Sequence, residues 1–252
     1  MFRYIIYLIS CINFIIYSSN KKKIYFILLI IINFLYTQLL FQLLYKKKYE
    51  KIKQNYKSYI NTNKLRLKNK EWFLNNIPFW YHLLKINKLF KKKLQILEIG
   101  SYMGNSTIFF LKYLTNSKII CVDTFKGGLE HQNNKYDFNY IYKSFKKNMK
   151  IFEKRYKLFK MESQKFFEKK RKKVFDIIYI DGSHEYKDVL MDAKESYKIL
   201  KRNGFLIFDD YLFNFNKKIK NPINAINDFM VKNIRNFKIV YIYHQIIIKK
   251  IK

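Results

Sequence analysis

LQILEIGSYMGNST, residues 94–107, is the stretch that decides the fold of this chain. It begins with a short apolar run that is typical of a buried strand, and it ends in polar residues that suit the start of a helix. Between the two lies a loop with the pattern E-x-G-x-x-x-G, in which Gly100 and Gly104 allow a tight turn and a close approach of the backbone to a ligand. This pattern differs from the dinucleotide-binding G-x-G-x-x-G loop, which has a third glycine.

Beyond this stretch, short apolar runs alternate with segments of helix length, which is the signature of a parallel sheet with crossover helices. The sequence predicts strands at 94–99, 118–122, 156–160, 174–180 and 204–208, and helices at 104–115, 138–150, 163–172, 186–201 and 222–234. The final segment, FKIVYIYHQIIIKK, predicts an antiparallel hairpin that closes the sheet. We therefore expect an α/β fold with a Rossmann-like, doubly wound, mostly parallel sheet that binds ligands at the carboxyl ends of its strands.

Four blocks of this region carry a family resemblance: LEIGSYMGNST, CVDTFKGG, FDIIYIDGSHEYKDVLMDA and LKRNGFLIFDDY. Over about residues 91–250 the chain resembles the class I S-adenosylmethionine-dependent methyltransferases, and most of all the branch of macrocin-type and related sugar O-methyltransferases. The IDGSH and DDY blocks are the most specific parts of the resemblance.

The resemblance implies S-adenosylmethionine as the cofactor. An acidic residue at the end of the second strand, Asp123, is placed to accept hydrogen bonds from ribose hydroxyls. By position in the family, the methionine end of the cofactor would be surrounded by Glu98, Gly100, Ser101 and Gly104, and Ser163 would lie near the adenine.

Three carboxylates follow the fourth and fifth predicted strands, namely Asp181, Asp209 and Asp210. Because adjacent parallel strands end at the same edge of a sheet, these carboxylates would lie together and raise one another's pKa unless a cation lay among them. Oxygen ligands with open positions suit Mg²⁺ or Mn²⁺, and such a metal would chelate a substrate diol and acidify its hydroxyl. The resembling sugar methyltransferases bind a metal with carboxylates at the matching positions.

The general base departs from the family pattern. Ser183 stands two residues after Asp181, where some relatives have an aspartate that acts as the base. His184 is the nearest replacement, because its reference pKa suits proton transfer near neutrality. A histidine that only caps a helix or supports the metal ligands is the alternative, and His131 is a further candidate in the loop after the second strand.

Two apolar runs, residues 4–17 and 24–45, precede this region. The second is long enough to cross a hydrocarbon core as a helix, and the lysines that follow it favour a cytoplasmic location for the downstream domain. We expect residues 1–45 to associate with a membrane and to leave the catalytic domain in the cytoplasm. The alternative is a cytoplasmic protein in which the second run packs as an amphipathic helix on the catalytic domain.

A polar stripe marks one face of the second apolar run, formed by Asn33, Thr37, Gln38 and Gln42. On a membrane-spanning helix such a stripe would need a partner, either the first apolar run or a second copy of the chain in a homo-oligomer. Residues 46–90 predict a polar, helical linker or lid with an aromatic cluster that packs on the catalytic domain or covers its pocket. The methyltransferase domain would then occupy residues 91–252.

The charge of the chain is strongly basic, with 51 Lys and Arg against 18 Asp and Glu. Nucleic acid is one partner that such a charge suits, but the sequence shows neither an Asn/Asp-Pro-Pro-Tyr/Phe block nor an appended RNA-binding module. Two cysteines, Cys11 and Cys121, offer no disulfide framework and no metal-ligand spacing. We expect metal-assisted O-methylation of a small hydroxylated substrate such as a sugar or glycan. A nucleic-acid methyltransferase and a membrane-anchored scaffold without turnover are the alternatives.

Overall fold

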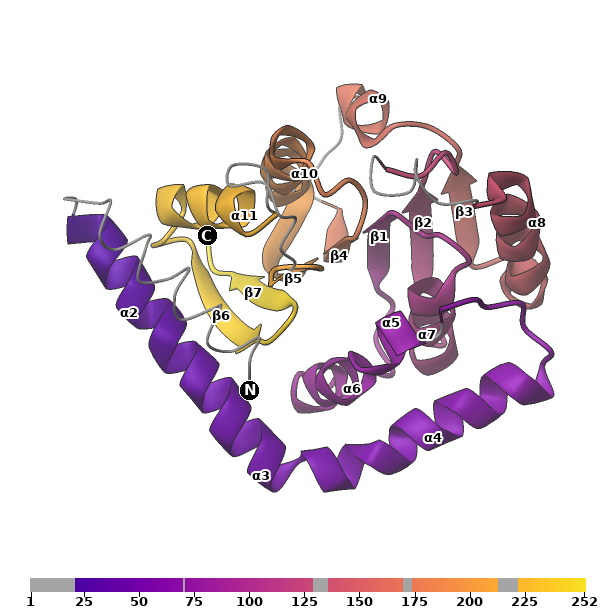
Figure 1. Ribbon diagram of the computed structural model, residues 1–252, viewed down its shortest axis with the longest axis horizontal. Helices are drawn as coiled ribbons and strands as arrows, with labels where there is room; N and C mark the ends of the chain where they lie inside the picture. Colours follow the sequence, from indigo (N-terminus) through magenta and orange to yellow (C-terminus); the bar gives the residue numbers. More distant parts are fainter. Residues whose placement is uncertain (1–20, 70, 129–135, 170–173, 213–221) are drawn as a thin grey trace.

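Seven strands form one sheet in the order β3-β2-β1-β4-β5-β7-β6 (Figure 1). The computed structural model describes residues 21–69, 71–128, 136–169, 174–212 and 222–252. The parallel strands are β1 (Gln95–Ile99), β2 (Lys118–Val122), β3 (Tyr156–Phe159), β4 (Phe175–Ile180) and β5 (Leu200–Phe208). The antiparallel hairpin consists of β6 (Phe237–Ile242) and β7 (Ile246–Lys250), and β7 pairs with β5. The predicted fold class, including the closing hairpin, is confirmed.

The central strands are buried on both faces, which is why they consist of nearly continuous apolar residues. The helices that connect or follow the strands are α7 (Asn105–Tyr113), α8 (Phe138–Met149) with the short η3 (Lys150–Phe152), α9 (Ser163–Glu168), α10 (Tyr186–Ile199) and α11 (Pro222–Lys232). Strand order reverses between β1 and β4, so the switch point at which such folds bind ligands lies above the ends of these two strands.

The start of β5 is the main difference from the predicted strands. β5 begins at Leu200, four positions before the predicted start at Gly204, because Leu200 pairs with Phe175 ahead of an irregularity in the β4–β5 register. Asn203 lies there with φ of 63°, a left-handed conformation that asparagine tolerates better than most residues. Downstream of this irregularity the register is regular, and Phe208, the last residue of β5, pairs with Ile180, the last residue of β4. The two residues after Phe208 therefore lie at the same end of the sheet as those after Ile180.

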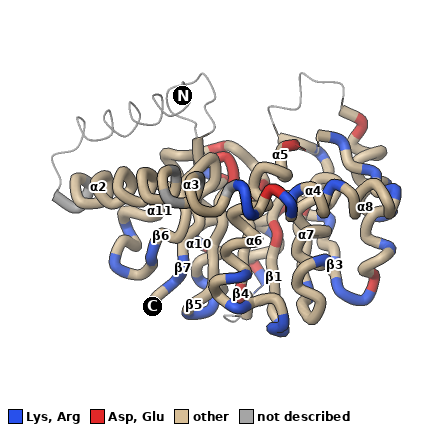
Figure 2. Tube along the Cα trace, turned by 90° about the horizontal axis from the view of Figure 1, so that it is seen from below, with Lys and Arg blue, Asp and Glu red and all other residues tan. Residues whose placement is uncertain are grey.

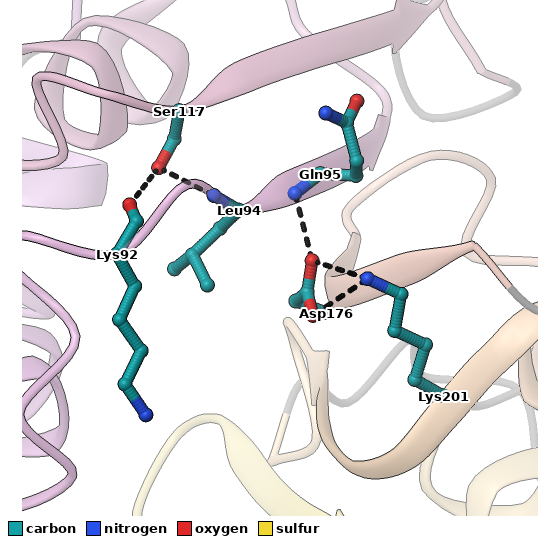
Figure 3. Close-up of polar contacts among 6 residues, drawn as sticks. All are labelled: Lys92, Leu94, Gln95, Ser117, Asp176 and Lys201. Atoms are coloured by element: carbon teal, nitrogen blue, oxygen red, sulfur yellow. Dashed lines mark hydrogen bonds and ion pairs between the residues drawn. The ribbon is translucent and has the colours of Figure 1, made fainter.

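Polar contacts fix the amino-terminal edge of the sheet, on the side away from the switch point (Figure 3). The carboxylate of Asp176 accepts the N–H of Gln95 over 2.8 Å and forms an ion pair with Lys201 over 3.0 Å. The hydroxyl of Ser117 accepts the N–H of Leu94 over 3.1 Å and donates to the carbonyl of Lys92 over 3.2 Å. These side chains join neighbouring strands at the amino-terminal ends of the sheet. The carboxyl-terminal ends, where the switch point lies, are on the other side.

The segment before the sheet is a run of helices that wraps around the domain (Figure 1). Its elements are α2 (Lys21–Tyr36), the π-helical turn η1 (Thr37–Phe41), α3 (Gln42–Leu44), α4 (Lys46–Thr62), α5 (Glu71–Leu74) and α6 (Ile77–Ile86). α2 and α4 form the two arms of a V that meet near α3, with α2 beside β6 and α4 beneath α7. The aromatic cluster predicted between residues 72 and 81 packs on the domain through buried Phe73, Phe79 and Trp80.

Helix α2 lies against the domain with one face. Its side chains Phe26, Ile27, Ile30 and Phe34 are buried in the core cluster that also contains residues of α10, α11 and β6. The hydroxyl of Thr37, in the turn after α2, accepts the N–H of Ile242 over 3.2 Å. The amphipathic packing that the sequence offered as the alternative is therefore the arrangement observed.

The membrane-spanning helix expected at residues 24–45 is not found. Within the described ranges of the chain, no helix is both long enough and apolar enough to cross a bilayer. The run is not one continuous α-helix, because the π-helical turn Thr37–Phe41 and a helix end at Tyr45 divide it. The hydropathy of the sequence also added the residues that face the domain to those on the outer face. The first apolar run, residues 4–17, lies outside the described residues.

Among the side chains that the structure describes in α2, η1 and α3, the exposed ones are apolar. They include Ile24, Tyr25, Leu28, Ile32, Leu35, Tyr36, Leu39, Leu43 and Leu44. Asn33, one of the polar residues expected to seek a partner, donates to the carbonyl of Leu29 in its own helix over 2.7 Å. Figure 2 shows Lys and Arg spread over several other elements, among them α4 and α8. Residues 24–36 of α2 contain no Lys, Arg, Asp or Glu. Contact of this segment with a membrane surface stays a prediction.

Candidate functional site

The glycine loop lies against the end of β4. Gly100 has φ of +82°, and a Cβ atom built on it would lie 1.8 Å from the carbonyl oxygen of Asp181. The N–H of Asp181 donates to the carbonyl of Ile99 over 2.8 Å, so the segments that follow β1 and β4 are in contact at the switch point. Gly104, with φ of +85°, caps the amino terminus of α7. The backbone of the loop therefore lies against the backbone that follows β4. Only glycine at position 100 permits this close approach.

Asp123 ties this loop to the end of β2. One carboxylate oxygen accepts the N–H groups of Ser101 and Tyr102, each over 2.8 Å, and the other accepts the N–H of Phe125 over 2.6 Å. A carboxylate has about four lone-pair sites, so these three bonds leave capacity for a ribose hydroxyl. The geometry agrees with the expected place of Asp123 beside the loop, and its contact with the ribose stays a prediction.

Glu98 lies beneath the loop and is fully buried. Its carboxylate accepts hydrogen bonds from the hydroxyls of Ser101, Ser106 and Thr107, and from the thiol of Cys121 over 3.6 Å. Burial raises the pKa of Glu98, and the hydroxyl donors act against that rise. These bonds fix the glycine loop and the first turn of α7 from inside. The sequence singled out Glu98 and Ser101, and it assigned the hydroxyls after Gly104 to the start of the helix, whereas Ser106 and Thr107 donate to Glu98.

Ser163 begins α9, as the predicted boundary had it, and its side chain hydrogen-bonds Asp192 of α10. Asp192 is 1% exposed, and its Oδ1 atom has no hydrogen-bond partner among the described residues. Burial raises the pKa of Asp192 to about 7, the Ser163 bond lowers it, and Asp188 adds a smaller rise. The sequence did not identify Asp192, which lies on the inner face of a helix whose outer face is charged.

We expect Asp192 to make the protein less stable as the pH rises from about 4 to about 7. A carboxyl whose pKa is raised by folding favours the folded state while it is protonated, and that contribution is lost as the pH passes through the folded-state pKa. The shift corresponds to at most about 4 kcal/mol. Urea unfolding at pH 5 and pH 8 should show a smaller difference for Asp192→Asn than for the wild type.

Asp188→Asn, on the exposed face of the same helix, is the matched control and should keep most of the wild-type pH dependence. An Asp192→Asn protein with the full wild-type difference between pH 5 and pH 8 would mean that the buried carboxyl does not titrate in this range.

The carboxylates after β4 and β5 lie together with His184. Asp181, His184 and Asp210 each offer a ligand atom within 4.8 Å of the others. His184 Nε2 lies 2.8 Å from an oxygen of Asp210. A small pocket lies here, and its apolar lining includes Val189, Phe208 and Ile226. Of the three carboxylates expected to hold a metal, the structure groups Asp181 and Asp210 with the histidine.

Asp209 takes a different position from its neighbour. Its Oδ2 atom accepts the hydroxyl of Tyr179, which also lies 2.8 Å from Oδ2 of Asp181, and its Oδ1 accepts the N–H of Asp210 over 2.8 Å. Burial, then the charge of Asp210, raises the pKa of Asp209 to about 7. Tyr179 is a site residue that sequence patterns did not reveal, because it lies within an apolar strand.

The same crowding affects Asp181. Burial raises its pKa well above the ordinary value, and the charges of Asp209 and Asp210 raise it further. Like charges held this close favour a cation between them, and two carboxylates with an open side suit a divalent ion that keeps water or substrate oxygens as further ligands. The residues present therefore fit Mg²⁺ or Mn²⁺ at this place.

Residues 46–90 contact the glycine loop directly. The buried hydroxyl of Tyr56 donates to the carbonyl oxygen of Asn105 over 2.6 Å, and the N–H of Lys68 donates to the sulfur of Met103 over 3.2 Å. The rings of Trp72 and Tyr102 lie 5.9 Å apart. These contacts show packing on the catalytic domain at the loop itself.

Comparison with known proteins adds a family model. The model described as "Methyltransferase domain" matches residues 97–211, a range that contains the glycine loop, Asp123 and all the carboxylates of the site. A curated protein of Acanthamoeba polyphaga mimivirus, itself uncharacterized, is 35% identical over 52 residues. That match covers 20% of this chain, and the chain spans about a quarter of the length of that relative, 24%.

Solved structures share the fold at low sequence identity. A protein of Corynebacterium glutamicum from structural genomics has a TM-score of 0.52 at 12% identity, with 79% of this chain and 89% of that chain covered. A Klebsiella pneumoniae protein assigned as an O-methyltransferase has a TM-score of 0.51 at 12% identity, with coverage of 87% and 98%. The MycE methyltransferase of mycinamycin biosynthesis, solved with Mg, SAH and mycinamycin VI, has a TM-score of 0.51 at 14% identity, with coverage of 70% and 50%.

Proposed function

We propose that this chain, an S-adenosylmethionine-dependent methyltransferase, transfers the methyl group to a hydroxyl oxygen of a small acceptor with the help of a divalent metal ion. The observation that carries the proposal is the group of Asp181, His184 and Asp210 at the ends of β4 and β5, in contact with the glycine loop through Gly100. A cofactor held at the loop would lie next to these residues and would supply the methyl group there.

In this proposal the cofactor is bound by the loop between β1 and α7, with Asp123 on the ribose and Ser163 beside the adenine. The fully buried Glu98 acts by holding the loop in place rather than by reaching the ligand. Asp181 and Asp210 would hold the metal ion, and a bound divalent ion lowers the pKa of a coordinated hydroxyl. His184, oriented by Asp210, accepts the proton of the acceptor hydroxyl.

The acceptor in the proposal is a sugar or glycan with neighbouring hydroxyls, since a metal ion with open positions binds a diol in preference to a single hydroxyl. The exposed apolar face of α2, η1 and α3 supports an acceptor that lies near a membrane, such as a glycan of a lipid. MycE is a fold relative solved with Mg, SAH and mycinamycin VI, so metal and cofactor product occur together in this fold.

Calorimetric titration of the whole chain with S-adenosylmethionine is the first test. We expect a dissociation constant on the order of micromolar. The second step is transfer of a labelled methyl group to sugars with vicinal hydroxyls and to their deoxy analogues, with Mn²⁺ and after chelation with EDTA. Transfer should require both the metal and the diol.

Two results would overturn parts of the proposal separately. Absence of cofactor binding would favour the interpretation of the chain as a scaffold without turnover. Methyl transfer that persists in EDTA would show that the reaction does not need a metal ion. In the same assay His184→Ala should lose turnover and keep Mn²⁺ binding, whereas loss of Mn²⁺ binding would make the histidine a ligand. Labelling of RNA in preference to sugars would favour the nucleic-acid alternative.

A further inference from the structure

Tyr179, near the end of β4, lies behind the carboxylates of the site and is 1% exposed. Side chains along a strand alternate between the two faces of a sheet. Tyr179 accordingly belongs to the core cluster that contains residues of α6 and α7, whereas Ile180 belongs to the cluster that contains residues of α10 and α11. The pocket beside His184 takes its apolar lining from this second cluster. Tyr179 therefore approaches the carboxylates from the other face of the sheet.

The hydroxyl of Tyr179 bridges two of the three carboxylates. It lies 2.8 Å from Oδ2 of Asp181, and it also hydrogen-bonds Oδ2 of Asp209. A phenol has a single hydrogen, so it donates to one of the two groups and can accept from the other when that group holds a proton. In either arrangement the phenol oxygen stays between the two groups and offsets the repulsion of like charges held close together.

The bridge gives the two carboxylates different roles. Asp209 is engaged through both oxygens, because Oδ2 contacts the phenol and Oδ1 accepts the N–H of Asp210 over 2.8 Å. Among the described residues, the group that could hold an ion consists of Asp181, His184 and Asp210. A ligand that a hydrogen bond already orients from behind binds a metal ion more tightly than a ligand that is free to turn. The phenol supplies such a hydrogen bond to Asp181.

The ring of Tyr179 is held in place by the amino-terminal helices. Trp80 of α6, which is 1% exposed, lies edge-on to it with the ring centroids 4.8 Å apart. The indole ring is itself fixed, because it stacks on Phe110 of α7 and its N–H donates to Oε1 of Gln245 over 2.8 Å. Since this packing holds the ring, removal of the hydroxyl alone should leave the rest of the Tyr179 side chain where it is.

We infer that Tyr179 is a positioning residue for the cation site, whose phenol orients Asp181 and holds Asp209 away from the ion. The inference rests on the proposed function, because the affinity for a divalent ion is the property that Tyr179 would set. It also assigns helix α6 to the catalytic unit, since Trp80 packs against the ring that carries the hydroxyl.

The test compares Mn²⁺ binding to the whole chain, measured by the electron paramagnetic resonance of free Mn²⁺, with S-adenosylmethionine binding measured by calorimetry. Tyr179→Phe removes one oxygen atom and keeps the ring. We expect Mn²⁺ affinity to fall about tenfold, as for other hydrogen-bond partners of metal ligands, and cofactor affinity to stay within about twofold. Tyr197→Phe is the matched control, because the hydroxyl of Tyr197 donates to the carbonyl of Asn236 over 2.7 Å, at the end of α10 far from His184. Neither affinity should change in the control.

A second comparison keeps the test informative if Tyr179→Phe folds poorly. Asp209→Asn removes the charge that the phenol separates from Asp181, and its amide can donate to a neighbouring carboxylate in place of the phenol. In this background we expect Tyr179→Phe to lower Mn²⁺ affinity by no more than about twofold relative to Asp209→Asn alone. A full tenfold fall there would contradict a role that acts through the pair of carboxylates.

The outcomes separate this inference from the proposed function. A wild-type chain that binds S-adenosylmethionine but no Mn²⁺ would overturn the metal-assisted function and the inference with it. A wild-type chain that binds Mn²⁺, with an equal or higher affinity in Tyr179→Phe, would overturn the inference alone, and a higher affinity would mean that the phenol competes with the ion. An equal fall of both affinities would mean that Tyr179 supports the fold in general, and this too would overturn the inference.

Discussion

Replacing Asp181 by asparagine is expected to lower the rate of methyl transfer about 1,000-fold, because a metal ion and its ligands contribute several kcal/mol of transition-state stabilisation. Asparagine has the same shape and can still accept the hydroxyl of Tyr179 through its amide oxygen. The fold should therefore persist and S-adenosylmethionine should bind within about threefold of the wild type, while Mn²⁺ binding is lost. The measurements are single-turnover transfer of a labelled methyl group and the two binding titrations.

Asp176→Asn is the matched control for this prediction. Asp176 belongs to the same strand, β4, and undergoes the same chemical change, but it lies at the opposite edge of the sheet, where it pairs with Lys201 (Figure 3). Its substitution should leave metal binding and turnover unchanged. Metal-dependent turnover in Asp181→Asn close to that of the wild type would remove Asp181 from the site.

Replacing Gly100 by alanine should have the second large effect, on the folded state itself. The added Cβ would lie 1.8 Å from the carbonyl oxygen of Asp181 and 2.8 Å from Cα of Gly182, and both are backbone atoms that cannot rotate away. The left-handed φ of +82° adds a further cost of about 1 kcal/mol for alanine. Together with the displacement of backbone, we expect a loss of about 4 kcal/mol, a large part of the stability of an ordinary domain.

Thermal unfolding and S-adenosylmethionine binding are the measurements for Gly100→Ala, with Gly182→Ala as the control. The nearest atom to a Cβ at position 182 is a methyl carbon of Ile99 at 3.2 Å, which is a side chain, so this variant should lose no more than about 1 kcal/mol. A Gly100→Ala protein that unfolds at the wild-type temperature and binds the cofactor normally would show that the loop can move away from β4.

The parts of the site that sequence analysis found are those encoded locally. The glycine loop, Asp123 and the carboxylates after β4 and β5 each follow a short apolar strand, so periodicity and position were enough to place them at one edge of the sheet. The closing hairpin was predictable for the same reason. These features need only neighbouring residues and the rule that parallel strands end together.

The parts that sequence analysis missed depend on contacts between distant residues. Asp209 and Asp210 are adjacent in the chain, and only the folded structure shows that Asp210, with its left-handed φ, is the one that joins His184. Trp80 reaches Gln245 across 165 positions, which no local pattern encodes. The membrane-spanning prediction failed in the same way, because hydropathy averages all faces of a helix and the partner of its inner face, β6, lies far along the sequence.

The docking of α2 on β6 has a consequence for the synthesis of the chain. Thr37 and its partner Ile242 are 205 positions apart, so the apolar inner face of α2 leaves the ribosome long before the strand that covers it. At translation rates of about 5–20 residues per second, this interval lasts about 10–40 s. During that time the nascent helix presents unpaired apolar surface on two faces. Its final packing must come late, after Ile242 has left the ribosome, and chaperones that bind apolar helices would have their longest access to this protein before then.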